Sequence, residues 1–205
     1  MRARGRIPGA CAVTSLPDVS EVRLALPAWR SWFLEAARLV VDAVPDGSAA
    51  LFFQSDIKRD GIWIDKAALV IRAAEEAGAR LLFHKIVCRR PPGLPSDDRP
   101  GYTHLIAVSR SLRCPDSLPI PDVVTDAGPR PWVRAMGIRA AAHAVRFARD
   151  QAGAMLIFDP FCGVGTVLAV ANDLGLDALG VEKSASRCGR ARVLAVTIGP
   201  ASRED

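Results

Sequence analysis

The pattern of apolar and polar positions alternates between short apolar runs and longer segments with helical spacing. Short, mainly apolar runs predict buried strands at residues 10–16, 49–53, 80–88, 103–109, 155–158 and 178–181. Apolar residues at helical spacing predict helices at residues 28–44, 65–78, 132–150 and 184–196, with a further helix beginning at Gly163–Gly165. Strand and helix therefore alternate over most of the chain, which predicts a doubly wound, mostly parallel α/β sheet.

Two of these strands are expected to break the parallel pattern. Residues 80–88 and 103–109 are separated only by a loop rich in proline and glycine, so we expect them to pair as an antiparallel hairpin. The polar stretch 54–61 and the proline-rich stretch 112–131 are predicted to hold no regular element.

Composition limits the binding partners and the cellular location that we expect for the chain. The net charge is +5 and the sequence pI about 9.3, which is compatible with a nucleic-acid partner. The five cysteines are scattered and form no C-x-x-C pair, so we expect neither a zinc site nor a disulfide framework, and free thiols favour a cytoplasmic location. No apolar run has the length of a membrane span, so we predict no contact with a membrane. The cysteine spacing leads us to predict no bound metal.

The strongest motif is a glycine-rich turn between a strand and a helix. The strand Met155–Phe158 is followed by Asp159-Pro-Phe-Cys-Gly-Val-Gly-Thr166 and then by an apolar segment. Glycines in such a turn let a ligand approach the backbone closely. Glu182 ends the next strand about 20 residues later, where an acidic side chain can accept hydrogen bonds from both ribose hydroxyls.

Two residues argue against a dinucleotide at this turn. Leu168 occupies the position of the third glycine of a G-x-G-x-x-G motif. The carboxylate of Asp159 would repel a pyrophosphate, but it suits the ammonium group of S-adenosylmethionine (SAM). A tight turn that binds nothing is the alternative interpretation.

Asp159–Thr166 together with Leu179-Gly-Val-Glu182 resembles the SAM-binding motifs of class I amino-methyltransferases. The form D-P-F-C-G-x-G-T is typical of the adenine-N6 and cytosine-N4 DNA methyltransferases and of related RNA enzymes. The resemblance implies a Rossmann-like class I fold with SAM as the cofactor. The implied SAM-binding residues are Asp159, Pro160, Phe161, Cys162, Gly163, Gly165, Thr166, Glu182 and Lys183.

The position of this motif late in the chain resembles the circularly permuted, beta-type members of the family, in which the catalytic half precedes the SAM half. The prediction is one methyltransferase domain over residues 1–205. Its expected parts are a catalytic and substrate half at 10–110, a linker at 111–131 and a SAM-binding half at 132–205.

In that arrangement the first strand ends in a catalytic tetrapeptide, [D/S/N]-P-P-[Y/F/W]. The matching residues are Ser15, Leu16, Pro17 and Asp18, in which Leu16 replaces a proline and Asp18 replaces the aromatic residue. The resemblance implies that Ser15 and the backbone near Leu16 orient the acceptor, with Asp18 as a candidate general base. The alternative is an ordinary turn at the end of a strand.

Candidate substrate-binding residues follow the other strands. Asp56 and Lys58 come after an apolar strand, where ligands of doubly wound sheets bind. The predicted hairpin interleaves basic and aromatic groups, which suits a nucleic-acid backbone, through His84, Lys85, Arg89, Arg90 and Tyr102. Solvated loops and a core histidine are the alternative readings.

These observations predict a SAM-dependent methyltransferase that transfers a methyl group to a nitrogen of a nucleobase. Sequence-specific DNA enzymes of this type usually carry a larger recognition insert before the segment at Trp132, so RNA is favoured over DNA, or a partner protein supplies specificity. The alternatives are a methyltransferase for a small molecule or a protein, and a catalytically inactive SAM-binding partner subunit.

Overall fold

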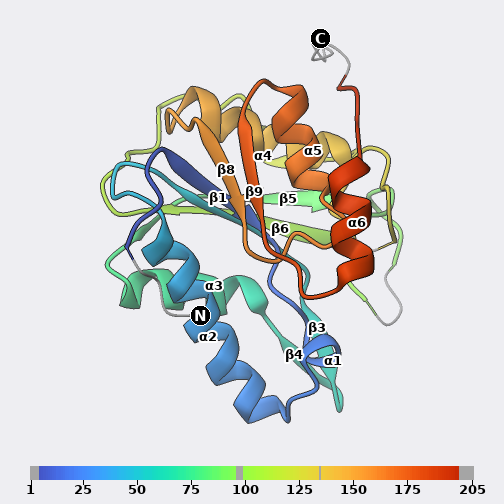
Figure 1. Cartoon of the computed structure of the whole chain (residues 1–205). Helices are drawn as coiled ribbons and strands as arrows, with labels where there is room; N and C mark the ends of the chain where they lie inside the picture. Colours follow the sequence, from blue (N-terminus) through green and yellow to red (C-terminus); the bar gives the residue numbers. More distant parts are fainter. Residues whose placement is uncertain (1–4, 96–98, 134, 199–205) are drawn as a thin grey trace.

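The computed structural model describes residues 5–95, 99–133 and 135–198 and is built on a seven-stranded sheet (Figure 1). The strand order is β7-β5-β6-β2-β1-β8-β9. The strands are β1 Ala10–Thr14, β2 Ala50–Gln54, β5 Arg80–Cys88, β6 Tyr102–Ser109, β7 Val123–Val124, β8 Leu156–Asp159 and β9 Asp177–Gly180.

Strand β1 lies inside the sheet and pairs in parallel with both β2 and β8. All five of its residues are buried. Strand β6 is antiparallel to both β2 and β5, whereas the remaining pairings are parallel. The predicted mostly parallel sheet with an antiparallel hairpin is therefore confirmed. The carboxyl ends of β1, β2, β5, β8 and β9 consequently meet at one edge, together with the start of β6.

Helices cover both faces of the sheet (Figure 1). Their bounds are α1 Val19–Val22, α2 Leu26–Ala43, α3 Lys66–Glu76, α4 Ile138–Asp150, α5 Thr166–Asp173 and α6 Ala185–Val193. One apolar core lies between the sheet and α2 and α3, and the other lies between the sheet and α4 and α5. Helix α4 packs against β1 with small side chains such as Ala140, Ala144 and Ala148, which let the helix approach the strand closely.

Local signals explain both ends of α3. Asp65 caps α3 by accepting a hydrogen bond from the backbone N–H of Ala68 at 2.9 Å, as its position before an amphipathic segment predicts. Gly78 follows that helix with a φ of +75°, a left-handed conformation that favours glycine.

The expected helix at 132–150 begins later than predicted, at Ile138. Gly137 stands at its N-cap with φ +97° and ψ 141°, a conformation essentially limited to glycine. A Cβ on Gly137 would lie 2.3 Å from the carbonyl oxygen of Ala127, so the chain turns sharply there against the preceding loop. Trp132 and Met136 therefore lie in a loop, where they face the cavity described below.

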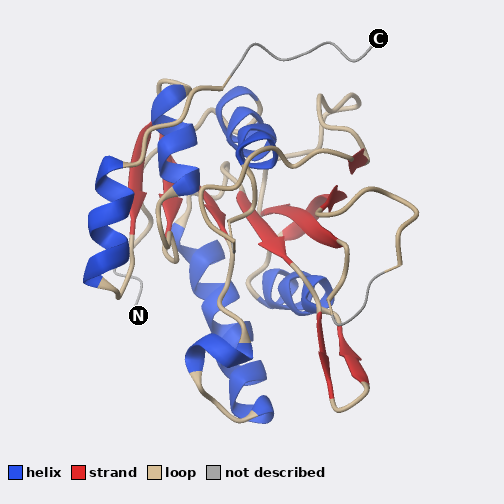
Figure 2. Cartoon of the chain, turned by 90° about the vertical axis from the view of Figure 1, so that its right-hand side faces the viewer, coloured by secondary structure: helices blue, strands red, loops and turns tan. Residues whose placement is uncertain are grey.

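Four short elements were not predicted. Strand β3 Ile57–Arg59 lies in the stretch 54–61 that was predicted as a polar loop, and it pairs with β4 Ile62–Ile64 in a hairpin that turns at Asp60-Gly61 and extends away from the sheet (Figure 2). Strand β7 lies within the proline-rich stretch, and α1 follows the tetrapeptide. Each of these elements has four residues or fewer, which is too short for a periodic pattern to emerge.

Among the described residues, no helix combines the length and apolar character that crossing a bilayer requires.

The tight turn at Gly137 predicts a large difference between two glycine substitutions. Gly137→Ala should lower the free energy of unfolding by about 2–4 kcal/mol, because the new Cβ meets the Ala127 carbonyl in a glycine-only conformation. Gly153→Ala is the matched control, with a φ of +60° and open space around its Cβ, and should cost about 1 kcal/mol. Equal losses in chemical denaturation would contradict this account.

Candidate active site

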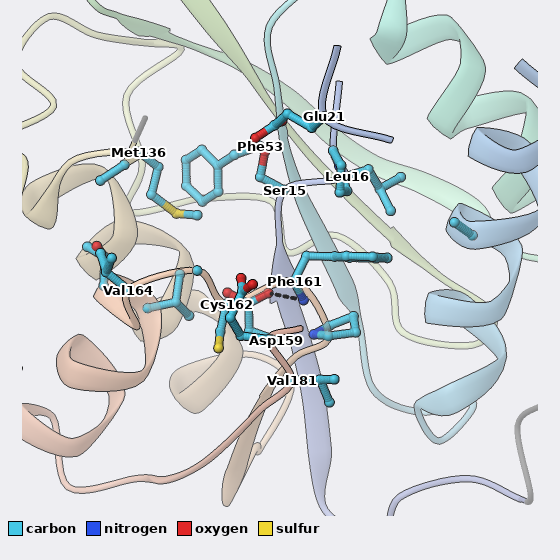
Figure 3. A pocket seen from close by; sticks show the side chains of 18 of the residues that line it. Ser15, Leu16, Glu21, Phe53, Met136, Asp159, Phe161, Cys162, Val164 and Val181 are labelled. Carbon is cyan, nitrogen blue, oxygen red and sulfur yellow. Dashed lines mark hydrogen bonds between the residues drawn. The ribbon is translucent and has the colours of Figure 1, made fainter. Parts of the chain in front are cut away.

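A cavity of about 1140 Å³ opens along the edge where the carboxyl ends of the parallel strands meet. Its walls come from the glycine turn after β8, the segment after β1, and the ends of β2, β5 and β6. Figure 3 shows Asp159, Phe161 and Cys162 together in one part of it, with Ser15, Leu16 and Phe53 in another. Residues far apart in the sequence therefore share one chamber.

The glycine turn places backbone rather than side chains against this chamber. Gly163 has a φ of +58° and would have no atom within 4 Å of an added Cβ, so its face is open to a ligand. Gly165, with a φ of +82°, packs against Ala191 of α6 instead, and a Cβ there would lie 2.8 Å from the Ala191 Cβ. The first glycine therefore leaves room for a ligand, and the second joins the turn to α6.

Asp159 ends β8 with its side chain buried at the cavity wall. Its Oδ1 accepts hydrogen bonds from the Thr14 hydroxyl at 2.6 Å and from the Phe161 backbone N–H at 3.1 Å. Burial raises the pKa of Asp159 to about 7; the two hydrogen bonds act in the opposite direction, and the nearby Glu182 raises it further. A cationic ligand group would stabilise the carboxylate form.

Glu182 follows β9 on the other side of the turn. Its Oε1 accepts a hydrogen bond from the Ser184 N–H at 2.8 Å, and its side chain is almost entirely buried while lining the cavity. A carboxylate has about four acceptor positions, so Glu182 retains capacity for further donors. Of the predicted SAM-binding residues, all except Gly165 line the cavity: Asp159, Pro160, Phe161, Cys162, Gly163, Thr166, Glu182 and Lys183.

Cys162 does not have the properties of a reactive thiol. Burial, followed by the charges of Asp159 and Glu182, raises the pKa of Cys162 to about 12. Because the thiolate is the nucleophilic form, Cys162 serves as a packing residue of the turn.

The segment after β1 supports part of the tetrapeptide prediction. Ser15, Leu16 and Pro17 line the cavity, but Asp18 is not among the lining residues. Asp18 caps α1 instead: its Oδ1 accepts a hydrogen bond from the Val19 N–H at 2.6 Å, and its own N–H donates to Glu21 at 3.0 Å. The proposal that Asp18 is a general base has no support in this geometry, whereas Glu21 does line the cavity.

The predicted substrate residues separate into two groups. Arg89 lines the cavity, but Asp56 and His84 belong to a hydrogen-bonded chain outside its lining. His84 Nε2 lies 2.8 Å from His104 Nδ1, and His104 Nε2 lies 2.9 Å from Asp56 Oδ2. The other Asp56 oxygen accepts the Lys66 N–H at 2.9 Å, which ties the start of α3 to the sheet.

The remaining predicted substrate residues also lie outside the cavity lining. Lys58 is exposed on β3, Lys85 forms an ion pair with Asp122, and Arg90 is exposed after β5. Tyr102 packs edge-on against His104, with its hydroxyl 3.5 Å from Asp56. Asp56, Asp65 and His104 place one potential ligand atom each within 4.8 Å of one another, but Asp56 and His104 already bond each other. We therefore assign this group a structural role.

Sequence reasoning missed several residues in or beside the cavity. Thr14 lies within the predicted strand 10–16 and outside the cavity lining, and only its hydrogen bond to Asp159 connects it to the site. Ser55 and Thr103 are joined by a 2.6 Å hydrogen bond across β2 and β6, a pairing that no local pattern reveals. Phe53 reads as a core residue, but it also forms part of the cavity wall.

No family model and no curated protein matches the chain. Solved structures do. TTHA0409, a putative DNA modification methylase from Thermus thermophilus complexed with S-adenosyl-L-methionine, matches with a TM-score of 0.66 at 18% identity, over 92% of this chain and 84% of that one. The PvuII cytosine-N4-specific DNA methyltransferase matches with a TM-score of 0.67 at 15% identity, over 93% of this chain and 81% of that one.

The M1.HpyAVI–SAM complex is also similar, with a TM-score of 0.58 at 11% identity, over 89% of this chain and 85% of that one. Similarity at these identities establishes a shared architecture. The chain has the class I methyltransferase fold. The predicted Rossmann-like fold is thereby confirmed, and the likeness in fold to these solved structures extends over nearly the whole chain.

The buried carboxylate of Asp56 should be important for stability. Burial alone raises the pKa of Asp56, but hydrogen bonds from His104 and Lys66 outweigh it, so the net pKa lies below the ordinary value. Asp56→Asn should lower the free energy of unfolding by about 2–4 kcal/mol near neutral pH, because the amide nitrogen replaces one of the two accepting oxygens and leaves either Lys66 or the His104 and Trp63 side chains without an acceptor.

The difference should be full above about pH 4 and disappear as pH falls through the lowered pKa. Denaturant titrations at several pH values measure it. Asp60→Asn, at the exposed turn of the β3–β4 hairpin, is the control and should be close to neutral, because asparagine tolerates its positive φ of 51°. Matching losses in both variants would refute the assignment.

Proposed function

We propose that this protein is a SAM-dependent methyltransferase that methylates an amino nitrogen of a nucleobase in nucleic acid. One observation carries the proposal. The end of β8, with Asp159, and the end of β1, with Ser15, open into the same cavity and are joined by the Thr14–Asp159 hydrogen bond. This arrangement suits a methyl donor and an acceptor that must meet between two neighbouring strand ends.

The residues present fit SAM. The open face of Gly163 allows close approach, the buried Asp159 carboxylate suits the ammonium group, and Glu182 suits the ribose hydroxyls. The cavity volume of about 1140 Å³ exceeds the roughly 300–1000 Å³ typical of a pocket for one small ligand. There is therefore room for an acceptor as well as the cofactor.

When bound, SAM supplies the methyl group as an electrophile. The contribution of the chain is to bind, orient and exclude water, which can provide much of the rate enhancement. On the acceptor side, Ser15 and the backbone at Leu16 offer hydrogen-bonding groups, while Phe53 and Met136 supply apolar surface for a ring (Figure 3). Phe53 and Met136 would take the part of the aromatic residue that Asp18 replaces.

Nucleic acid is the proposed acceptor class because the chain is basic and its structural neighbours carry the names of DNA methyltransferases. Those names do not support the expected preference for RNA, so both DNA and RNA are proposed as acceptors and both are tested. We further propose the circularly permuted order, since β1, β2, β5 and β6 precede the strands that carry the SAM motif. A partner protein that supplies specificity remains part of the proposal.

A second candidate is a SAM-binding subunit without activity of its own. The observation that favours it is Asp18, which stands where the family has an aromatic residue and is used as a helix cap. SAM binding without methyl transfer to any acceptor would support this alternative.

Transfer of labelled methyl from SAM separates these functions. The purified protein should label DNA or RNA fractions of a cell extract, and not its protein or small-molecule fractions. Ser15→Ala should lower turnover by about tenfold or more while leaving the SAM dissociation constant unchanged, because it removes a polar group only from the acceptor side. Ser31→Ala, on the exposed side of α2, is the control. Label confined to protein or metabolites would overturn the nucleic-acid assignment.

The pKa of Asp159 predicts how SAM affinity depends on pH. The carboxylate form binds an ammonium group, so affinity should rise as pH increases through about 7. Between pH 6 and 7.5 the expected increase is roughly eightfold for one group with this pKa, and this range stays below the pKa of an α-amino group.

Asp159→Asn should weaken SAM binding at least tenfold and remove this pH dependence, because an amide carries no charge to pair with the ammonium. Asp116→Asn, at an exposed position of a loop, should retain both the SAM affinity and its pH dependence. Calorimetric titration with SAM measures both properties, and a flat profile for the wild-type protein would contradict the role given to Asp159.

A further inference from the structure

Charge is unevenly distributed along the cavity. Asp159 and Glu182 lie at β8 and β9, at the end assigned to the cationic cofactor. Arg89 follows β5 and belongs to the other end, where β2 and β6 contribute Ser55 and Thr103. In the sheet, β6, β2 and β1 lie between β5 and β8, so Arg89 faces a different part of a bound pair of ligands from Asp159 and Glu182, although Lys183 and Arg187 also line the end that holds the two carboxylates.

Arg89 is held firmly but has unused donors. Its backbone N–H donates to the Gly101 carbonyl at 2.7 Å, and its side-chain NH1 donates to the Ser55 hydroxyl at 3.3 Å. Ser55 is itself fixed by the 2.6 Å bond to Thr103. A guanidinium has five N–H donors, and within residues 5–95, 99–133 and 135–198 no carboxylate forms an ion pair with Arg89.

The charges that act on Arg89 are positive. Partial burial lowers the pKa of Arg89, and Arg130 and Arg99 lower it further by repulsion. Arg130 lines the same cavity from the loop before α4. That loop is anchored next to Arg130, because the Pro129 carbonyl accepts the Ile138 N–H at 2.9 Å. A half-buried guanidinium with cationic neighbours is stabilised by an anionic ligand.

We propose that Arg89 and Arg130 form a phosphate-binding subsite at the acceptor end of the cavity, with the Ser55 and Thr103 hydroxyls beside it. Planar guanidinium groups bind phosphate oxygens through paired hydrogen bonds. The subsite would hold the phosphate next to the nucleotide whose base is methylated, so this inference rests on the proposed function. Such a contact fixes the position of the acceptor without reading its sequence.

Binding of fluorescently labelled DNA and RNA oligonucleotides, followed by anisotropy over a series of salt concentrations, tests the subsite. Arg89→Gln and Arg130→Gln should each weaken binding by about three- to tenfold and reduce the salt slope by about one. Arg89→Lys should retain most of the salt slope. The control is Arg80→Gln, at the exposed opposite end of β5, which should bind like the wild type. Wild-type binding by both glutamine variants, or an equal loss in the control, would overturn the subsite.

Two further measurements separate this inference from the proposed function and identify the source of the phosphate. Calorimetry with SAM should give unchanged affinity in both variants, and failure of the wild-type protein to bind SAM would overturn the proposed function instead. Competition with a nucleoside monophosphate should displace the oligonucleotide only weakly if the phosphate belongs to a strand. Tight binding of the monophosphate that is lost in Arg89→Gln would retain the subsite and assign it to a free nucleotide.

Discussion

The hydrogen bond between Thr14 and Asp159 is the contact on which the arrangement of the site depends. It joins the ends of two adjacent parallel strands that are separated by most of the chain, and it is fully buried. Because Thr14 immediately precedes Ser15, and Asp159 immediately precedes the glycine turn, this bond fixes the position of one segment relative to the other. A buried carboxylate also requires a donor, which gives the sheet an energetic reason to keep this register.

The order of the strands places acidic, apolar and basic side chains at different positions along the edge of the sheet. Carboxylates stand at the ends of β8 and β9, the Phe53 ring and the Ser15 hydroxyl stand at the ends of β2 and β1, and arginines stand after β5 and in the loop before α4. No single segment of the sequence contains all three. Parallel strand ends that meet at one edge can bring a cationic group, a planar ring and an anion into one row.

The elements that could be predicted are those whose signal is local and long enough. Strands such as 49–53 are continuous apolar runs, and the helix capped by Asp65 has both a cap and an amphipathic face. The glycine turn predicted a cofactor site because glycines, a preceding acid and a later acid occur at a characteristic spacing, and the structure places most of these residues around one cavity.

The rest depended on contacts between distant residues. Asp18 reads as a reactive carboxylate in sequence, but a helix of one turn, too short to show a pattern, makes it a cap. Trp132 reads as the start of a helix, but the conformation of Gly137 moves that start. His84 and Asp56 read as separate ligand contacts, because nothing in either segment reveals that His104 lies between them.

The hydrogen bonds that join Asp56, His104 and His84 have a defined donor and acceptor order. An ionised carboxylate only accepts hydrogen bonds, so His104 carries its proton on Nε2, towards Asp56. In a neutral His104, Nδ1 must then accept, and the exposed His84 must present its own proton from Nε2. A buried negative charge thus sets the tautomer of a ring at the protein surface, so the state of an interior residue can be read from an imidazole that solvent reaches.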